Sequence, residues 1–180
     1  AEAEVEYADK SSPAVDVSFR VLDQAALSTR LDFELPKDTE VHLPIWTTTP
    51  WTLPANQAVA LHPEATYAVV ASSDKQHLWI IGDALCEAVL ARYADVDALV
   101  IGRVLGKALA GLRLAHPFMA RDVPLVLGEH VTMETGTGAV HTAPAHGQDD
   151  FLLGKQYDLP VESPINDQGC FDCSVPGLQG

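Results

Sequence analysis

Short segments in which apolar and polar residues alternate recur along this chain, and they constrain its fold more than any other feature. Residues 15–21, for example, read Val-Asp-Val-Ser-Phe-Arg-Val, which is the period-two pattern of a half-buried strand. Gly, Pro, Asp and Asn separate one such segment from the next, as turns require. The expected strands are residues 15–21, 41–49, 66–71, 77–81, 99–104, 112–115, 125–127 and 139–142.

Helical patterns are few. One helix is predicted to start at Asp83, a favourable N-cap residue, because the apolar residues that follow it share one helical face. A second helix is predicted to follow Gly147 and to run to about Tyr157. Many short strands with only two helices predict a mainly β fold with helical decoration, and specifically a closed or nearly closed β-barrel.

Length and composition predict one domain. A chain of 180 residues with 47% hydrophobic residues can bury a single core. Residues 1–13 are acidic and small without periodicity, so a flexible lead-in is expected there. Residues 14–160 would form the domain, and residues 161–180, which are rich in Pro, Gly and Asp, would form a loop-rich tail of the same unit.

Several classes of protein are disfavoured by what the sequence lacks. It contains no long apolar stretch, no signal peptide and too few cysteines for a disulfide framework, so a cytoplasmic protein with reduced thiols is expected. Cys170 and Cys173 could form half a zinc site or a redox pair, but no second ligand pair lies near them in the sequence. Glycine-rich nucleotide-binding loops and the G-x-S-x-G elbow of serine hydrolases are missing. The net charge of −14 argues against tight binding of nucleic acid by this chain alone.

A first candidate site segment is residues 47–56, Thr-Thr-Thr-Pro-Trp-Thr-Leu-Pro-Ala-Asn. Thr47, Thr48 and Thr49 end a predicted strand, where successive side chains point to opposite faces and the residue before a proline stays extended. β-Branched residues are also ordinary strand formers, so the triplet by itself could be purely structural. Two prolines within five residues fix a rigid turn, which favours a functional interpretation of the whole segment.

A second candidate segment, residues 136–150, reads Gly-Thr-Gly-Ala-Val-His-Thr-Ala-Pro-Ala-His-Gly-Gln-Asp-Asp. Gly136 and Gly138 flank Thr137 and permit close approach of the backbone to a ligand, although glycines so spaced occur in many plain turns. His141 lies on an apolar strand, where a hydrogen-bonded core histidine is the ordinary interpretation.

The same segment raises the question of a metal site. Asp149 and Asp150 fall near the start of a predicted helix, where acidic residues often only cap the helix or favour its dipole. With His141 and His146 they could also supply three or four metal ligands. The H-x4-H spacing differs from that of helical zinc motifs, and Pro144 interrupts any helix between the two histidines. No metal ligand is therefore assigned.

Together the two segments resemble the editing domain inserted into class I aminoacyl-tRNA synthetases for branched aliphatic amino acids. The sequences of the two segments are most similar to those of the isoleucine-specific branch. The leucine and valine enzymes are expected to carry Thr-Arg-Pro in place of the threonine run. The resemblance covers residues from about 41 to 157. It implies hydrolysis of valyl-tRNA(Ile) by a size-excluding pocket, with valyl-adenylate as a second candidate substrate. The 3′ end of that tRNA and the remainder of a parent synthetase are the implied partners, and no cofactor is implied.

Roles for single residues are carried over from this resemblance. The implied catalytic residues, which would position the terminal adenosine, the ester and the attacking water, are Thr47, Thr48, Thr49 and Asn56. The implied substrate-binding residues are Trp51, Thr52, Gly136, Thr137, His141 and Asp150. Among them, Asp150 would hold the α-ammonium group of the amino acid. A metal-dependent hydrolase and a non-catalytic module that binds the acylated 3′ end are the open alternatives.

Overall fold

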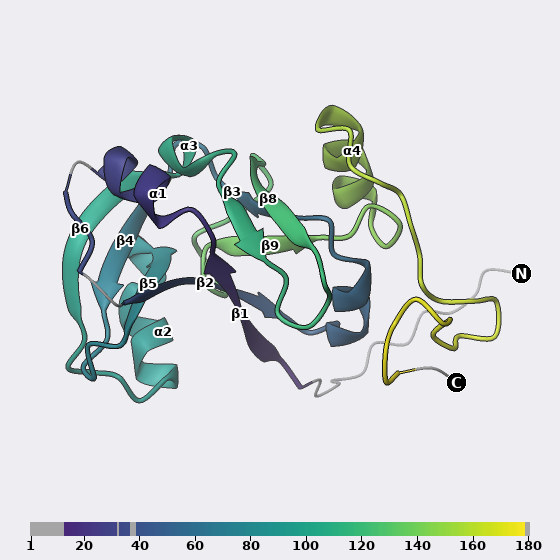
Figure 1. Cartoon of the computed structure of the whole chain (residues 1–180), viewed down its shortest axis with the longest axis horizontal. Coiled ribbons are helices and arrows are strands. Elements are labelled where there is room, and N and C mark those ends of the chain that lie inside the picture. Colours follow the sequence, from purple (N-terminus) through teal and green to yellow (C-terminus); the bar gives the residue numbers. More distant parts are fainter. Residues whose placement is uncertain (1–12, 32, 37–38, 179–180) are drawn as a thin grey trace, which may run out of the picture.

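The computed structural model describes residues 13–31, 33–36 and 39–178. In this part of the chain nine strands form one sheet, and short helices cover parts of it (Figure 1). The strands are β1 (Val15–Val21), β2 (Glu40–Thr47), β3 (Ala58–Leu61), β4 (Thr66–Ala71), β5 (His77–Gly82), β6 (Leu99–Leu105), β7 (Arg113–Ala115), β8 (Asp122–Leu127) and β9 (Ala139–Thr142). The helices are α1 (Gln24–Leu31), α2 (Cys86–Arg92), α3 (Gly106–Leu109), α4 (Gln148–Gln156) and the 3-10 helices η1 (Pro50–Ala55) and η2 (Asp83–Leu85). The predicted mainly β class with helical decoration is confirmed.

The strand order describes an open sheet. It runs β6-β4-β5-β2-β1-β7-β8-β3-β9, so β6 and β9 lie at opposite ends and do not pair with each other. A barrel requires hydrogen bonds between the first and last strands of this order. The predicted closed or nearly closed barrel is therefore wrong. Alternation along a strand indicates which side chains face a core, but it carries no information on whether the last strand meets the first.

One main core nevertheless lies inside the sheet. Each of the nine strands contributes at least one buried side chain to it, including Phe19 of β1, Leu43 of β2, Val59 of β3, Val104 of β6 and Ala139 of β9. Since side chains from both ends of the strand order meet in one cluster, the sheet must curve around that cluster without closing. The curvature places the strands that carry the two candidate segments close together.

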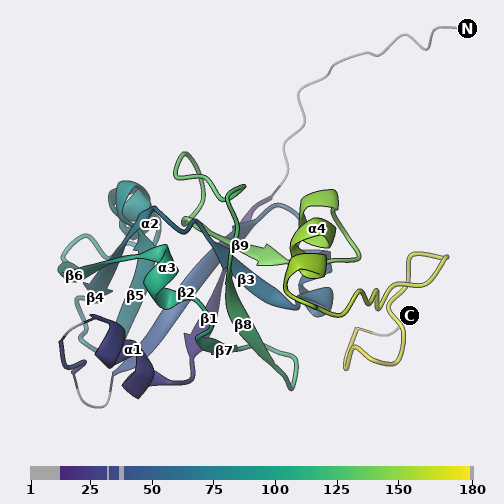
Figure 2. The same cartoon turned by 90° about the horizontal axis from the view of Figure 1, so that it is seen from above.

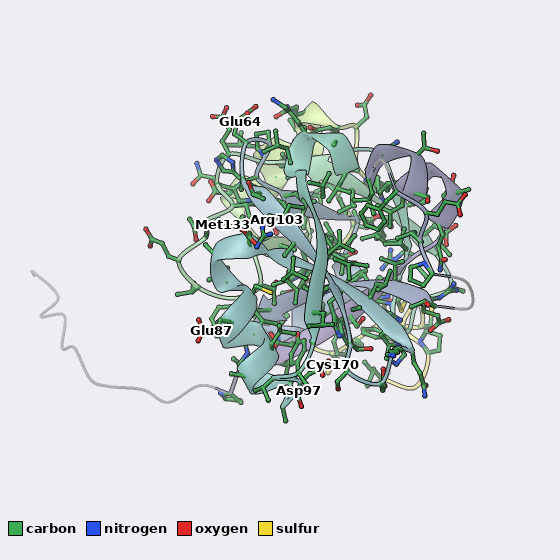
Figure 3. The ribbon with its side chains drawn as sticks, turned by 90° about the vertical axis from the view of Figure 1, so that its left-hand side faces the viewer. Glu64, Glu87, Asp97, Arg103, Met133 and Cys170 are labelled. Carbon is green, nitrogen blue, oxygen red and sulfur yellow. The ribbon has the colours of Figure 1, made fainter. Side chains whose placement is uncertain are left out.

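Two helices cover the outer face of the sheet at its two ends (Figure 2). The cluster under α2 is Ala68, Val70, Ile81, Leu85, Cys86, Val89 and Leu90. The cluster beside α4 is Ala58, Ala60, Val126, Val131 and Leu153. Figure 3 looks onto the α2 end, where Glu87 lies on the exposed side of the helix. The helix predicted from Asp83 is thus confirmed, with η2 as its first turn. The helix predicted after Gly147 is α4.

The sequence did not predict β3, α1, the short helix α3 or the 3-10 helix η1. β3 reads Ala-Val-Ala-Leu, and all four residues are buried, so no alternation marks it as a strand. α1 follows Asp23, whose carboxylate accepts a hydrogen bond from the N–H of Ala26 (2.8 Å), as an N-cap does. Leu27 and Leu31, one helical turn apart, are its buried residues. A cap followed by two leucines four residues apart was a usable signal for this helix.

The predicted lead-in and tail are only partly within the described residues. The lead-in, residues 1–13, lies outside them except for Pro13. From residue 161 to residue 178 the chain forms neither helix nor strand, apart from an isolated bridge between Ile165 and Phe171. In the described part of the chain, every helix is too short or too polar to cross a membrane.

A tight contact between two glycines fixes the loop before β9. Gly138 has a φ of +81°, in the region that glycine adopts without strain. A Cβ at Gly138 would lie 2.9 Å from the Cα of Gly82 at the end of β5. The N–H of Gly82 donates to the carbonyl of Thr137 (2.8 Å), and the hydroxyl of Tyr67 donates to the carbonyl of Gly138 (2.6 Å). The loop is therefore held against β4 and β5 by these two hydrogen bonds and by a close approach of Gly138 to Gly82 that a side chain at Gly138 would prevent.

Replacement of Gly138 tests this contact. Gly138→Ala should lower the free energy of unfolding by about 2 to 3 kcal/mol, because backbone strain adds to the overlap with Gly82. Gly111→Ala is the matched control: its φ is +78°, but nothing lies within 4 Å of the added Cβ. At Gly111, backbone strain alone should lower the free energy of unfolding by about 1 kcal/mol. Urea unfolding of both variants measures the difference, and equal losses would show that the Gly82 contact does not restrict the position.

Candidate functional site

The two candidate segments meet at one pocket of about 370 Å³. The residues after η1 form β3, which pairs antiparallel with β9, so that Ala58 lies opposite Thr142. The N–H of Gln57 extends this pairing by donating to the carbonyl of Thr142 (2.8 Å). The predicted site residues that line the pocket are Thr47, Thr48, Thr49, Thr52, Gly136, Thr137, His141 and Asp150.

The threonine run forms the turn that leaves β2. The strand ends at Thr47, two residues earlier than predicted, where the hydroxyl oxygen of Thr47 accepts a hydrogen bond from the N–H of Thr49 (2.9 Å). Thr47 is buried, Thr48 is exposed and Thr49 is half-buried. Because the hydroxyl of Thr47 acts as acceptor in this bond, its own hydrogen can be donated to a ligand.

Two side chains from the region around β7 and β8 hold η1 in place. The Nδ1 atom of His116 accepts from the N–H of Met119 (3.0 Å), which leaves Nε2–H to donate to the carbonyl of Leu53 (2.9 Å). The guanidinium of Arg121 donates to the carbonyl of Pro54. Burial lowers the pKa of His116, which favours the neutral tautomer that these bonds require. The turn is therefore fixed to the sheet through its backbone carbonyls.

His141 is hydrogen-bonded through both ring nitrogens. The hydroxyl of Thr52 donates to the carbonyl of Thr49 (2.9 Å), so it accepts from the Nε2–H of His141 (3.0 Å). Nδ1 then carries the lone pair and faces Nδ2 of Asn56 at 3.4 Å. The amide of Asn56 also donates to the carbonyl of Ala58 (2.8 Å). This network assigns the Nε2–H tautomer to His141 and engages both of its nitrogens within the protein.

Burial keeps the imidazole of His141 neutral. The residue is 9% exposed. Burial lowers its pKa to about 4, and the neighbouring His116 and His146 act in the same direction. At neutral pH the side chain therefore carries no charge. It is suited to lining the pocket and to hydrogen bonding, and poorly suited to taking up a proton.

Asp149 and Asp150 differ in their surroundings although they are adjacent in the first turn of α4. Asp150 is half-buried, lines the pocket, and accepts a hydrogen bond at Oδ2 from the N–H of Ala143 (2.9 Å). Burial raises the pKa of Asp150, and the bond from Ala143 opposes this shift. Asp149 is exposed and lines a different cavity. A cation placed beside Asp150 would stabilise the charged carboxylate, and within the described residues its other oxygen accepts no hydrogen bond.

Two predicted residues do not line the pocket. Asn56 is fully buried, and its amide nitrogen lies 3.4 Å from Nδ1 of His141. Its Oδ1 has no hydrogen-bond partner within the described part of the chain. Trp51 is 52% exposed, and its ring meets that of His146 edge-on, with centroids 5.4 Å apart. Because His146 lines the pocket, Trp51 lies at the rim rather than on a wall.

The pocket also contains residues that sequence reasoning did not assign to the site. They are Trp46, His130, Thr132, Thr135, Gly138, Ala139, Val140 and His146. Alternation along β2 could have indicated Trp46, because it precedes Thr47 and faces away from the core. The loop residues 130–135 follow no pattern of spacing that would have indicated them.

Two other features lie away from this pocket. A larger cavity, of about 710 Å³, is lined by the end of η1, Arg121 and residues after 161, and it contains none of the predicted site residues. In the described residues, one group of three potential metal ligands comes together, namely Glu40, His42 and His77. None of these three lines the pocket.

Known proteins are similar to this chain in sequence. The sequence model of the family described as leucyl-tRNA synthetase, editing domain, matches residues 27–172. The isoleucine–tRNA ligase of Alkalilimnicola ehrlichii is 55% identical over 100% of this chain, and that of Thiobacillus denitrificans is 52% identical over 100% of it. The chain spans 19% of the length of each of these curated relatives.

Solved structures share the fold. The crystal structure of GlLeuRS-CP1 has a TM-score of 0.70 at 16% identity, with 85% of this chain and 70% of that chain covered. The P. knowlesi cytosolic leucyl-tRNA synthetase editing domain has a TM-score of 0.66 at 14% identity, with 77% and 59% covered. At such identities the likeness concerns the fold alone. Together with the family match over residues 27–172, these similarities show that the chain belongs to the family of editing domains of class I aminoacyl-tRNA synthetases, with isoleucine–tRNA ligases as its close sequence relatives.

Proposed function

We propose that this chain hydrolyses the ester of valyl-tRNA(Ile), the mischarged product of an isoleucine-specific synthetase, and that valyl-adenylate is a second substrate. The observation that carries the proposal is one pocket in which threonine hydroxyls and the Asp150 carboxylate face the same space. Membership of the editing-domain family supports hydrolytic proofreading as the class of reaction. Because the chain spans 19% of its relatives' length, the remainder of a parent synthetase would deliver the acylated 3′ end.

Asp150 is proposed to bind the α-ammonium group of the amino acid. Its Oδ2 is fixed by the N–H of Ala143, which leaves Oδ1 to accept from the substrate. A charge-assisted hydrogen bond of this kind contributes about 1.5 to 3 kcal/mol. The ammonium would also reverse the upward shift of the Asp150 pKa, which comes mainly from burial. Holding this group fixes the carbonyl carbon two bonds away.

The threonine run is proposed to orient the attacking water and the ester. An aminoacyl ester is already activated, so its hydrolysis needs an oriented water and donors for the developing oxyanion more than a strong nucleophile. Thr47 and Thr48 can donate hydroxyl hydrogens to the pocket, since no bond of the protein uses them as donors within the described residues. The water oxygen would attack the carbonyl carbon, the bond to the ribose oxygen would break, and a proton would pass to that ribose oxygen.

Thr52 and His141 are proposed to form the wall that excludes larger side chains. Their mutual hydrogen bond fixes both positions, and the low pKa of His141 argues against its use as a general base. A rigid wall discriminates by size, because an added methylene overpacks it. Valine would then be accepted and isoleucine rejected.

Asp150→Ala should reduce hydrolysis of valyl-tRNA(Ile) by roughly ten- to a hundredfold, as the loss of a charge-assisted bond predicts. Asp149→Ala is the matched control and should have little effect, because Asp149 is exposed and lines another cavity. The measurement is single-turnover deacylation of valyl-tRNA(Ile) by this chain.

In the same assay, Asp150→Asn distinguishes the effect of removing the negative charge from the effect of removing the side chain. Its amide oxygen can still accept a hydrogen bond from the N–H of Ala143. Equal effects of replacing Asp149 and Asp150 would refute the assignment of the ammonium site. If the unaltered chain binds valyl-tRNA(Ile) without hydrolysing it, the proposed activity is wrong and a binding module is favoured.

Trimming the proposed wall should make isoleucyl-tRNA(Ile) a substrate. Overpacking typically costs about 1 to 3 kcal/mol, so Thr52→Ala or His141→Ala should raise hydrolysis of the isoleucyl ester relative to the valyl ester by about tenfold. Thr52→Ser is the control that retains the hydroxyl bonded to His141 while removing one methyl group.

The comparison is made with both esters, after circular dichroism has shown that each variant folds. If the alanine variants keep the parent's preference for valine, other residues form the wall. If His141→Ala abolishes hydrolysis of both esters, His141 has a catalytic or structural role instead.

The buried His141 should make folding stability depend on pH. Its folded pKa is about 4, below the ordinary value of 6.5. Between these values the unfolded chain takes up a proton that the folded state does not, so stability falls as pH is lowered, by at most about 3 kcal/mol. In His141→Gln, the unfolding free energy should fall less between pH 6.5 and 4 than in the parent. Above pH 7 the two curves should run parallel, and identical slopes at all pH values would contradict the assignment.

A further inference from the structure

Two histidines and a glutamate lie together on the outer face of the sheet, in a part of the molecule that the proposed hydrolysis does not use. β2 and β5 run parallel there, with Glu40 opposite His77 and His42 opposite Trp79. Paired residues on neighbouring strands share a face, as do residues two apart on one strand. Glu40, His42 and His77 are therefore on the same face, and one potential ligand atom of each lies within 4.8 Å of the others.

This set of side chains matches the ligand chemistry of zinc. Two imidazoles and one carboxylate are the protein ligands of open zinc sites that keep a fourth position for water. Metal–ligand distances of about 2.0 to 2.2 Å place the ligand atoms about 3.3 to 3.5 Å apart around a tetrahedral ion. Nε2 of His42 and Oε2 of Glu40 are already 3.3 Å apart. The ligand atom of His77 lies within 4.8 Å of the other two, so modest side-chain rotations would complete the approach.

Both histidines have further features of metal ligands. Oγ of Ser18 lies 2.8 Å from Nδ1 of His42, so it can accept Nδ1–H and leave the lone pair of Nε2 on the side of Glu40. Nδ1 of His77 is buried without a hydrogen-bond partner in the described part of the chain. Buried polar atoms in folded proteins nearly always have a partner, so an ion or a water molecule is expected beside this nitrogen. Burial lowers the pKa of His42, and the nearby Glu40 opposes that shift.

The charges around the group are compatible with a cation. Arg20 lies 3.9 Å from Oε1 of Glu40, but both side chains are largely exposed, and such a pair is weak. His77 also lines an adjoining cavity of about 400 Å³, whose walls include the carboxylates of Asp16, Asp74 and Asp95. Asp16 is paired with Arg92, whereas Asp74 and Asp95 form no ion pair among the described residues, so two further carboxylates face that cavity beside His77.

We propose that Glu40, His42 and His77 bind one divalent transition-metal ion, with Zn²⁺ as the ion and water as the fourth ligand. The site is separate from the hydrolytic pocket, since His42 and Thr47 lie about 17 Å apart along β2. β2 and β5 pair through three residue pairs, and they join the β4, β5 and β6 part of the sheet to the rest. An ion across this junction would hold the two parts together, because a ligand of the folded state stabilises it.

Calorimetric titration of the chelator-treated chain tests the site. Zn²⁺ should bind with a stoichiometry of one per chain and should raise the melting temperature, whereas Mg²⁺, which prefers oxygen ligands, should do neither. Glu40→Gln, His42→Ala and His77→Ala should each weaken Zn²⁺ binding by about tenfold or more. His62→Ala is the matched control, because His62 is also half-buried but lies outside the group. This variant should bind Zn²⁺ as the parent does.

Absence of stoichiometric binding, or binding that survives all three ligand replacements, would overturn the proposal. Glu40 is exposed, so loss of binding in a Glu40→Gln variant with an unchanged circular dichroism spectrum cannot be assigned to unfolding. Deacylation of valyl-tRNA(Ile) should proceed at the same rate in zinc-free and zinc-loaded chain. A loss of activity in chelator that added zinc restores would contradict the separation of this site from the hydrolytic pocket and would favour a metal-dependent hydrolase.

Discussion

The hydrogen bond between Thr52 and His141 is the contact on which the arrangement of the pocket depends. It joins residues 89 positions apart and ties η1 to β9. Thr52 can only accept in this bond, because its own hydrogen is donated to the carbonyl of Thr49. Asn56 binds the other imidazole nitrogen. Since Thr52, His141 and Asn56 are all buried, loss of any one partner would leave an unsatisfied polar group, which costs about 1 to 3 kcal/mol.

Every strand except β3 could be predicted from the sequence, and the sheet that the strands form could not. Alternation of apolar and polar residues predicted β1. β3 was not predicted, because all four of its side chains are buried and no such alternation occurs. The order of the strands, the parallel pairing of β2 with β5 and the failure of β6 to meet β9 depend on contacts between distant segments. A period-two pattern indicates which face of a strand is buried, but it does not indicate which strands lie beside it in the sheet.

The candidate site could be predicted to the level of its segments, and less well to the level of single side chains. The adjacent acids Asp149 and Asp150 are indistinguishable by composition, and only their positions on the first turn of α4 expose one and half-bury the other. Trp51 was expected to bind substrate; in the structure it lies in the 3-10 helix η1 with its exposed ring against that of His146. Asn56 was expected to help position the adenosine, the ester and the attacking water, which stays a prediction; in the structure its amide faces the imidazole of His141.

The acidic composition of the chain bears on how it could act on tRNA under the proposed function. A net charge of −14 opposes contacts with phosphates, and such contacts supply most of the affinity in nucleic-acid binding. The groups that line the pocket suit the aminoacyl end of the substrate. The Asp150 carboxylate attracts the positively charged α-ammonium group, and the neutral His141 does not repel it. Recognition by this chain would then depend on the ammonium, the size of the amino-acid side chain and the ester. Under this proposal, affinity for the body of the tRNA would have to come from a parent synthetase, since this chain spans 19% of the length of its isoleucine–tRNA ligase relatives.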